Sequence, residues 1–432
     1  MKYYSTKRQT SPVNLKEAVL KGLPADNGLF MPEHIPSLPN SFFEKIEQLS
    51  FQEIACEVAH NLLGEDIDKD KLQEIVISAI NFPAPLVSLS DTTYILELFH
   101  GNTLAFKDFG ARFMAKLMGY FVEGNTAALD ILVATSGDTG SAVAHGFFNV
   151  PNIHVTVLYP KGKVSNFQEK QFTTLGGNIT ALEIDGTFDD CQALVKQAFL
   201  DKTLNESLNL SSANSINISR LIPQSFYYFE AYKQLKDKQK PTVFVVPSGN
   251  FGNLTAGLLA KKMGLPISQF VAATNANDII PNYLQTGSYS PRPSIQTISN
   301  AMDVGNPSNF QRMLDLFGKV EEMRNQIIGY AFDDEQTAKA MRTVKEKYNY
   351  IIDPHGAVGY LALEKYIKEV NKDINGIVLE TAHPVKFAEV VSPQIGEEVA
   401  IPERMRYLLE KPKMSIPLGT DFEGLKDFLL KK

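Results

Sequence analysis

One lysine of this chain has neighbours that could make its amine a nucleophile. Lys107 lies between Phe106 and Phe109 at the expected start of a helix, within residues 99–110 (FHGNTLAFKDFG). The start of a helix carries partial positive charge and apolar neighbours exclude water, so both effects lower the lysine pKa. A lysine with a lowered pKa can form a Schiff base with a carbonyl compound. For any single lysine a solvated surface position is the commoner explanation, so other residues must support this interpretation.

Two turns that contain glycine are candidates for anion binding. Residues 134–144 (ATSGDTGSAVA) and 246–256 (VPSGNFGNLTA) each follow an expected strand and lead into an expected helix. Glycine lets the backbone approach an anion, and the free amides at the start of the helix point toward it. One such turn alone is more typical of a purely structural connection. Two of them, both rich in hydroxyl and amide donors, favour binding of a phosphate or a carboxylate.

Three further segments carry suitable donors. Residues 161–165 (KGKVS) and 215–220 (SINISR) place cations beside hydroxyl and amide groups. Together they suit a phosphate, although solvated surface charge explains each equally well. Thr381, in residues 379–384 (LETAHP), follows the last clear strand. Its hydroxyl could pair with a ring nitrogen at the ligand-binding edge of a sheet, whereas alone it would be an ordinary strand end.

The motifs of other common chemistries do not occur in the sequence. GxGxxG, GxxxxGK[ST] and HExxH are all absent, and the seven histidines are scattered. Dinucleotide, P-loop and metal sites are therefore weak predictions, and we expect no metal.

The composition predicts a cytoplasmic protein that binds a small molecule. With 42 basic and 49 acidic residues the net charge is −7, which favours neither nucleic acid nor an anionic membrane as a partner. No apolar run is long enough to span a membrane, and the polar first 16 residues do not resemble a secretory signal. Cys56 and Cys191 are far apart in sequence and form no metal-binding motif, so reduced thiols are expected.

The order of the expected elements indicates an α/β fold. The first 80 or so residues are mostly helical, and Pro83 and Pro85 mark a boundary. The expected helices there cover residues 14–20, 41–49 and 51–63, and the expected strands that follow cover 130–135, 153–158, 179–184, 242–246, 269–273 and 377–380. Strands alternating with helices at this spacing predict parallel sheets covered on both faces.

At these motifs the chain resembles the tryptophan-synthase β-like family of pyridoxal phosphate (PLP) enzymes, fold type II. Within that family it is most similar to the branch that makes threonine. The matching segments are residues 22–32 (GLPADNGLFMP), 99–109, 135–141, 248–253, 353–359 (DPHGAVG) and 380–384. The likeness runs from about Tyr4 to Val391. The chain departs from the family pattern at Asn102, where proline is frequent, and at Gly356, where threonine is common.

The resemblance implies a fold of two parallel-sheet α/β lobes with a mostly helical N-terminal region. We expect an N-terminal domain of residues 1–84, a large PLP-binding domain of 85–125 and 205–432, and a small domain of 126–204. It also implies that Lys107 binds PLP as a Schiff base and then moves protons. The implied cofactor contacts are Gly249, Asn250, Phe251, Gly252 and Asn253 at the phosphate, Thr381 at the pyridine nitrogen and Asp138 near the 3′ oxygen. The implied substrate contacts are Thr135, Ser136, Thr139, Gly140 and Ser141 at the carboxylate, and Lys163, Ser215, Asn217 and Arg220 at a phosphate.

The reaction implied by the resemblance converts O-phospho-L-homoserine and water to L-threonine and phosphate. This would make the protein a carbon–oxygen lyase acting on phosphate, at the last step of threonine biosynthesis, with the smaller lobe closing to keep water out until late. Two alternatives stay open. A serine/threonine dehydratase or β-replacing synthase would keep PLP but would need no second phosphate site, and a non-catalytic binding protein would keep only the fold. A monomer or homodimer is expected.

Overall fold

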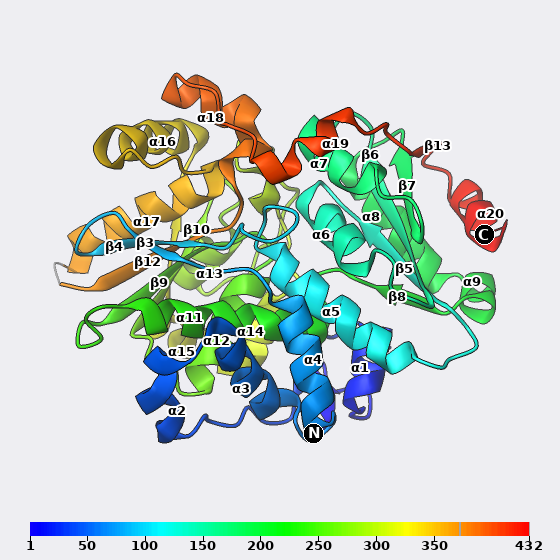
Figure 1. The fold of residues 1–432 in the computed structure, drawn as a ribbon, viewed down its shortest axis with the longest axis horizontal. Helices are drawn as coiled ribbons and strands as arrows, with labels where there is room; N and C mark the ends of the chain where they lie inside the picture. Colours follow the sequence, from blue (N-terminus) through cyan, green and yellow to red (C-terminus); the bar gives the residue numbers. More distant parts are fainter. Residues whose placement is uncertain (371–372, 432) are drawn as a thin grey trace.

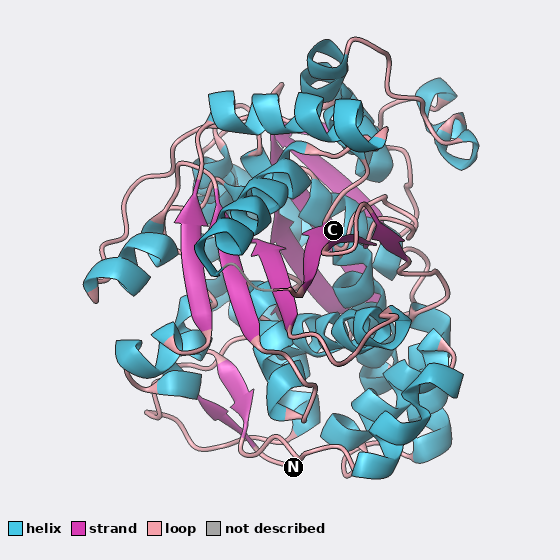
Figure 2. Cartoon of the chain, turned by 90° about the vertical axis from the view of Figure 1, so that its left-hand side faces the viewer, coloured by secondary structure: helices cyan, strands magenta, loops and turns pink. Residues whose placement is uncertain are grey.

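The larger of two parallel sheets forms the centre of the molecule. The computed structural model describes residues 1–370 and 373–431. Its six-stranded sheet has the order β11-β10-β9-β12-β4-β3, and every neighbouring pair is parallel except β3 with β4. The strands are β3 (Leu86–Ser88), β4 (Thr93–Glu97), β9 (Thr242–Pro247), β10 (Gln269–Thr274), β11 (Ile327–Ala331) and β12 (Asn375–Glu380). Figure 2 shows helices in front of and behind these strands.

The burial of β9 explains why its sequence is apolar without alternation. Phe244 and Val246 belong to one buried cluster, which also contains residues of α11 (Phe226–Gln234) and α12 (Gly252–Lys262). Val243 and Val245 belong to a second cluster, which contains residues of α16 (Asp334–Tyr348) and α17 (Pro354–Val370). Both faces of the strand are therefore covered, as expected for a parallel sheet.

The second sheet has five strands in the order β13-β7-β6-β5-β8, all parallel. They are β5 (Leu129–Ala134), β6 (Ile153–Pro160), β7 (Ile179–Ile184), β8 (Leu210–Ser212) and β13 (Ile416–Leu418). The expected small domain ended at residue 204, whereas β8 and β13 lie beyond that boundary and pair within this sheet. Figure 1 shows how β13 reaches this sheet: after α18 (Ala388–Ile395) the chain crosses over to the side of the five-stranded sheet, where it ends in α20 (Phe422–Lys431).

The N-terminal region is mostly helical, as predicted, and also contains a small antiparallel sheet of β1 (Tyr3–Ser5) and β2 (Phe30–Pro32). Its helices are α1 (Leu15–Lys21), α2 (Asn40–Lys45), α3 (Phe51–Leu63) and α4 (Lys69–Ala79). Asn14 caps α1 by accepting a hydrogen bond from the Glu17 N–H at 2.8 Å. Ser50 and Glu53 form a capping box at the start of α3.

The remaining helices connect the strands of the two sheets. They are α5 (Lys107–Val122), α6 (Asp138–Phe147), α7 (Asn166–Thr173), α8 (Phe188–Leu200), α9 (Lys202–Ser207), α10 (Ile218–Leu221), α13 (Ile279–Thr286), α14 (Phe310–Phe317), α15 (Val320–Arg324) and α19 (Tyr407–Glu410). In Figure 1, α5 begins near the centre of the molecule and runs beneath β5 and β8 of the five-stranded sheet. Helix α5 therefore links the two halves and places its first residue at their junction.

Three adjacent strands bring the sequence motifs to one edge of the large sheet. Strand β12 pairs in parallel with β4 on one side and with β9 on the other. Strand β9 leads into the turn before α12, β12 leads into Thr381, and β4 leads into the segment that ends at Lys107. Because carboxyl ends of parallel strands meet at the same edge, the three motifs come together there.

Candidate active site

A cleft of about 1900 Å³ opens at this edge of the sheet. Most of the residues expected at the site line it: Lys107, Ser136, Asp138, Thr139, Lys163, Ser215, Arg220, Gly249, Asn250, Phe251, Gly252, Asn253 and Thr381. They come from both sheets and from the turns that follow their strands. The structure thus places in one cleft residues that are spread over some two thirds of the sequence.

Lys107 is the first residue of α5, as its sequence context predicts. Its side chain is 17% exposed, on the cleft wall, and its Nζ lies 5.6 Å from the centre of the Phe106 ring. Burial lowers the pKa of Lys107, and the carboxylate of Asp138, 3.5 Å from Nζ, acts against that shift. The result is an amine that loses its proton more easily than a surface lysine.

The loop before Lys107 folds around a buried carboxylate. Asp108 accepts hydrogen bonds from the Thr103 N–H and from the Thr103 hydroxyl, both at 2.7 Å. Gly101 is required here, because a Cβ at that position would lie 2.3 Å from Asp108 Oδ2. Leu104 adopts a φ of +60°, which non-glycine residues rarely do. These contacts fix the direction in which α5 begins.

Residues 249–253 form a cradle of free backbone amides at the start of α12. Within the described residues, the backbone N–H groups of these five residues have no hydrogen-bond acceptor. Phe251 stands before the helix in a left-handed conformation, φ +59°. The Asn253 side chain is used internally, since its Oδ1 accepts from the Ser248 hydroxyl and its Nδ2 donates to the Pro247 carbonyl. Such a set of amides at a helix N-terminus suits a phosphate group.

Thr381 presents a free hydroxyl to the cleft. Its side chain is 6% exposed and, among the described residues, makes no hydrogen bond. A neutral hydroxyl at the end of a strand can form a hydrogen bond with a ring nitrogen, as the resemblance implied. An amine, an amide cradle and a free hydroxyl in one cleft together suit the aldehyde, the phosphate and the ring nitrogen of PLP.

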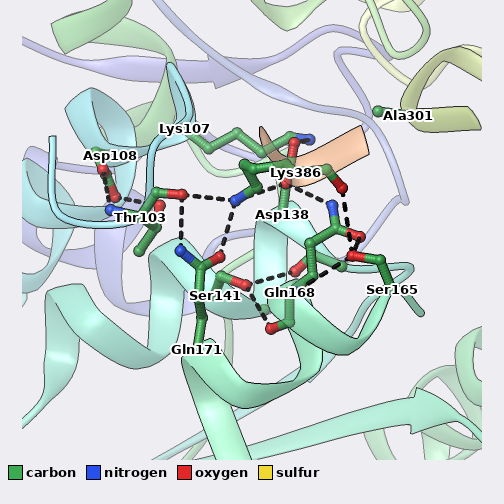
Figure 3. A network of polar contacts seen from close by, with 12 residues as sticks. Thr103, Lys107, Asp108, Asp138, Ser141, Ser165, Gln168, Gln171, Ala301 and Lys386 are labelled. Atoms are coloured by element: carbon green, nitrogen blue, oxygen red, sulfur yellow. Dashed lines mark hydrogen bonds and ion pairs between the residues drawn. The ribbon is translucent and has the colours of Figure 1, made fainter. Parts of the chain in front are cut away.

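Asp138 lies between two lysines (Figure 3). Its Oδ2 is 3.5 Å from Lys107 Nζ, and its Oδ1 is 2.9 Å from Lys386 Nζ. Oδ1 also accepts a hydrogen bond from Gln168 Nε2 at 2.7 Å. Burial alone would raise the pKa of Asp138, but Lys386 and Lys107 lower it far below its ordinary value. Asp138 is therefore an ionised carboxylate inside the cleft.

The turn after β5 contributes fewer side chains than expected. Ser136 and Thr139 line the cleft, whereas Thr135, Gly140 and Ser141 are not among the described residues that line it. The Thr135 hydroxyl accepts the N–H groups of Gly137 and Gly140, and the Ser141 hydroxyl donates to the Gly137 carbonyl. These groups hold the turn in shape, and a ligand contact by Thr135, Gly140 or Ser141 stays a prediction.

The second set of expected anion-binding residues lies only partly along the cleft. Lys163, Ser215 and Arg220 line the cleft, but Asn217 is not among the described residues that do. Its Oδ1 caps α10 by accepting the Ser219 N–H, and its Nδ2 donates to the Val19 carbonyl. Arg220 is 2% exposed, and its Nε has no hydrogen-bond partner in the described part of the chain. Burial lowers the pKa of Arg220 to about 10.

Two functional groups were not predicted from the sequence. Lys386 lies between Val385 and Phe387, and this apolar flanking is the same signal that marks Lys107, so it could have predicted Lys386 as well. His355 also lines the cleft. Its Nδ1 lies 2.6 Å from Asp353 Oδ2 and its Nε2 accepts the Ala301 N–H at 3.1 Å, so the ring holds the 301 segment in place.

The described part of the chain offers neither a membrane span nor a metal cluster. Across residues 1–370 and 373–431, no helix is long and apolar enough to cross a bilayer. No group of three or more His, Cys, Asp or Glu side chains in the same ranges could hold a metal ion.

Comparison with protein families places this cleft in a known class. The family model described as pyridoxal-phosphate dependent enzyme matches residues 77–379, well over half of the chain. The fold and the cleft thus define a PLP-dependent enzyme. Two further models flank this match: threonine synthase N terminus at residues 2–80 and threonine synthase C-terminal at residues 356–429.

Whole-chain relatives agree with the flanking models. Threonine synthase of Haemophilus influenzae is 46% identical, with 100% of both chains covered. That of Escherichia coli strain K12 is 45% identical, covering 100% of this chain and 99% of the relative. A structure of PLP-bound threonine synthase from Brucella melitensis superposes with a TM-score of 0.95 at 33% identity, covering 100% of this chain and 99% of the other. The chain therefore belongs to the threonine synthase family of PLP-dependent enzymes.

Proposed function

We propose that this protein converts O-phospho-L-homoserine and water to L-threonine and phosphate with PLP as cofactor. The observation that carries the proposal is that the cleft holds two cations, Lys163 and Arg220, in addition to the amide cradle and to Ser215, which lies beside the cradle residue Gly252. The amide cradle at residues 249–253 suits the phosphate of the cofactor, and Lys163, Ser215 and Arg220 suit a second phosphate. A dehydratase or a β-replacing synthase would need no second phosphate set.

The cofactor supplies one part of the chemistry. When bound, PLP acts as an electron sink for negative charge that develops on the substrate carbon atoms. The chain must then supply the proton transfers, the orientation of the substrate and the exclusion of water.

Lys107 is the group we assign to proton transfer. Its Nζ faces the cleft, and its lowered pKa leaves a fraction of the amine free to accept a proton from the substrate carbon next to the amino group. Asp138, 3.5 Å away, stabilises the ammonium form that results. Lys107 can therefore take up a proton and later return it.

The substrate would be held at both ends. We place its carboxylate at the start of α6, where the side chains of Ser136 and Thr139 line the cleft and the N–H groups of Asp138 and Thr139 have no acceptor among the described residues. We place its phosphate at Lys163, Ser215 and Arg220. Water has to be kept out until the phosphate has left, so we propose that the lobe carrying the five-stranded sheet closes on the substrate.

Assembly and location complete the proposal. We propose that the protein acts in the cytoplasm, as a monomer or homodimer, and that its N-terminal domain ends near residue 84 and its small domain begins near residue 126. Both cysteines, Cys56 and Cys191, are free thiols, which supports a reducing compartment.

The experiment is a measurement of inorganic phosphate and threonine from the full chain loaded with PLP. With O-phospho-L-homoserine as substrate, we expect equal amounts of both products. Lys107→Ala, which keeps the fold as judged by circular dichroism, should lose activity by about 10³-fold or more. No release of phosphate from O-phospho-L-homoserine, with L-serine deaminated instead, would overturn the proposal in favour of a dehydratase.

A further inference from the structure

Lys386 is a buried cation at the cleft whose partners are all parts of the protein. It lies in the short helix η4 (Pro384–Phe387), just after β12, and its side chain is 0% exposed. Its Nζ donates to the Thr103 carbonyl at 2.6 Å and to Gln171 Oε1 at 2.9 Å. The third partner is Asp138 Oδ1, also at 2.9 Å (Figure 3).

These three partners leave Lys386 without a free N–H donor for a ligand. An ammonium group has three N–H donors and no acceptor. Two hydrogen bonds and one ion pair account for all three, and the buried side chain has no exposed face. Lys386 borders the cleft, as Lys163 does, but its N–H donors are all used within the protein, so it has none left for a substrate anion.

The partners of Lys386 instead lead to Lys107 by two routes. The first is electrostatic: Asp138 turns Oδ1 to Lys386 and Oδ2 to Lys107, so one carboxylate serves two ammonium groups. The second is mechanical: Thr103 belongs to the loop that leads into Lys107. Gln171 Nε2 donates to the same Thr103 carbonyl at 3.0 Å, which ties α7 to that loop.

We propose that Lys386 is a positioning residue of the threonine synthase reaction. It holds the Asp138 carboxylate beside Lys107 and neutralises part of the negative charge of that carboxylate. The proposal rests on the proposed role of Lys107 as the reactive amine. Without Lys386, Asp138 would keep Gln168 as a neutral partner and would pair with Lys107 alone.

The charges around Lys107 predict the direction of the effect. Besides burial, which is the largest cause, Lys386 and Arg220 lower the pKa of Lys107 and Asp138 raises it. Removal of Lys386 takes away one of the lowering charges and leaves Asp138 unshared. Both changes act in the same direction, so the amine should hold its proton more tightly.

The test measures how readily Lys107 is acylated in the full-length, cofactor-free protein as a function of pH. Trace labelling with acetic anhydride, followed by mass spectrometry of the Lys107 peptide, gives the titration midpoint. For Lys386→Met we expect the midpoint to rise by about one pH unit, so that labelling at pH 8 slows about tenfold. Lys386→Arg, which keeps the charge, should restore most of the wild-type rate.

A purely structural role for Lys386 gives a different result. If Lys386 only ties the two lobes together, its loss exposes Lys107 and labelling becomes faster or stays the same, which would contradict the proposal. Gln171→Leu is the matched control, because it cuts the tie between α7 and Thr103 and removes one hydrogen bond of Lys386, but leaves the Lys386–Asp138 pair in place. We expect its midpoint to stay within about 0.3 pH unit of the wild type.

A double variant covers the case in which Lys386→Met does not fold. Asp138→Asn with Lys386→Met removes both members of the buried ion pair, which costs less than leaving one charge unpaired. Compared with Asp138→Asn alone, loss of Lys386 should then change the midpoint by less than half of one pH unit. A change of half of one pH unit or more in this background would show that Lys386 does not act through Asp138.

The labelling experiment is independent of turnover. It is done without substrate, so it decides the role of Lys386 even if phosphate release fails. Absence of phosphate release by the wild-type protein would instead contradict the proposed function. In the active protein, Lys386→Met should lower kcat more than it changes KM, because Lys386 does not contact substrate.

Discussion

The backbone N–H of Phe106 donates to the Thr381 carbonyl at 2.8 Å, so the residue before Lys107 is bonded to the residue after β12. The neighbouring residues Ala105 and Ala382 form an antiparallel bridge. Unlike β4, which pairs with β12 in parallel, this short segment runs antiparallel to the residues that follow β12. These contacts fix the Lys107 amine and the Thr381 hydroxyl relative to each other through the backbone alone, before any ligand binds.

The first prediction concerns the cofactor cradle. Asn250 Oδ1 accepts the Ser308 N–H at 3.0 Å, and the Asn250 carbonyl accepts the Asn309 N–H at 3.3 Å. Asn250→Ala leaves the Ser308 N–H without its partner and loosens the cradle, which should weaken PLP binding about tenfold. Loss of PLP absorbance during dialysis measures this. Gln285→Ala, at an exposed position of α13, should retain the cofactor like the wild type; equal retention by Asn250→Ala would count against the cradle.

The second prediction separates two lysines of one loop. Lys163 lines the cleft, whereas Lys161, two residues earlier and equally exposed, is not among the described residues that do. Lys163→Ala should raise KM for O-phospho-L-homoserine about five- to tenfold, with little change in kcat, because an ionic contact to phosphate is lost. Steady-state kinetics check this, with Lys161→Ala as the control. The same KM for both variants would remove Lys163 from the phosphate site.

Much of this site could be predicted because its signals are local. The apolar flanks and helix position of Lys107, and the turn at residues 248–253, can be read from short segments, and the structure places both at the cleft. Thr135 and Ser141 have the right side chains, but the Thr135 hydroxyl accepts two N–H groups of the turn and the Ser141 hydroxyl donates to the Gly137 carbonyl. No local pattern reveals how a hydroxyl divides its hydrogen bonds between backbone and ligand.

Long-range contacts explain what the sequence did not reveal. Lys386 acquires its role from the Thr103 carbonyl, 283 residues away, and from Gln171, 215 residues away. The strands β8 and β13 are three residues long, and only pairing with β5 and β7 makes them part of the five-stranded sheet. Strand β4, which leads to Lys107, was also not predicted, because a single five-residue run carries little periodicity.

The third prediction concerns Gly356, one of the two departures from the family pattern. A Cβ there would lie 1.6 Å from Glu380 Oε2 and 2.8 Å from Ile352 Cγ1. Gly356→Ala should therefore lower the free energy of unfolding by about 1–3 kcal/mol, measured by urea denaturation. In a Glu380→Ala background, Gly356→Ala should lower the free energy of unfolding by less, because Glu380 Oε2, the atom nearest to the added carbon, is gone. Gly424→Ala, whose added carbon meets only Leu418 at 3.6 Å, is the control. The same cost in both backgrounds would contradict this explanation.

The fourth prediction is a pH dependence of stability. Glu380 is fully buried, its Oε2 has no hydrogen-bond partner among the described residues, and burial together with Asp353 and Glu97 raises its pKa well above the ordinary value. The folded protein therefore keeps a proton that the unfolded chain releases above about pH 4.3. The free energy of unfolding consequently falls as pH rises from that point toward the folded pKa.

Glu380→Gln imitates the protonated carboxyl at every pH and removes this dependence. Relative to the wild type, the variant should be more stable at pH 8 than at pH 5, as measured by urea denaturation at both values. A difference between variant and wild type that does not change with pH would mean that Glu380 is ionised in the folded protein.

The central claim is that Lys107 is the residue that binds the cofactor covalently. Borohydride reduction of the PLP-loaded protein, followed by proteolysis and mass spectrometry, tests it directly, because reduction fixes the cofactor to the lysine that holds it. We predict the pyridoxyl mass on the peptide containing Lys107, and on that peptide alone. Attachment to Lys386 or to any other lysine, or no attachment after reduction, would contradict the account.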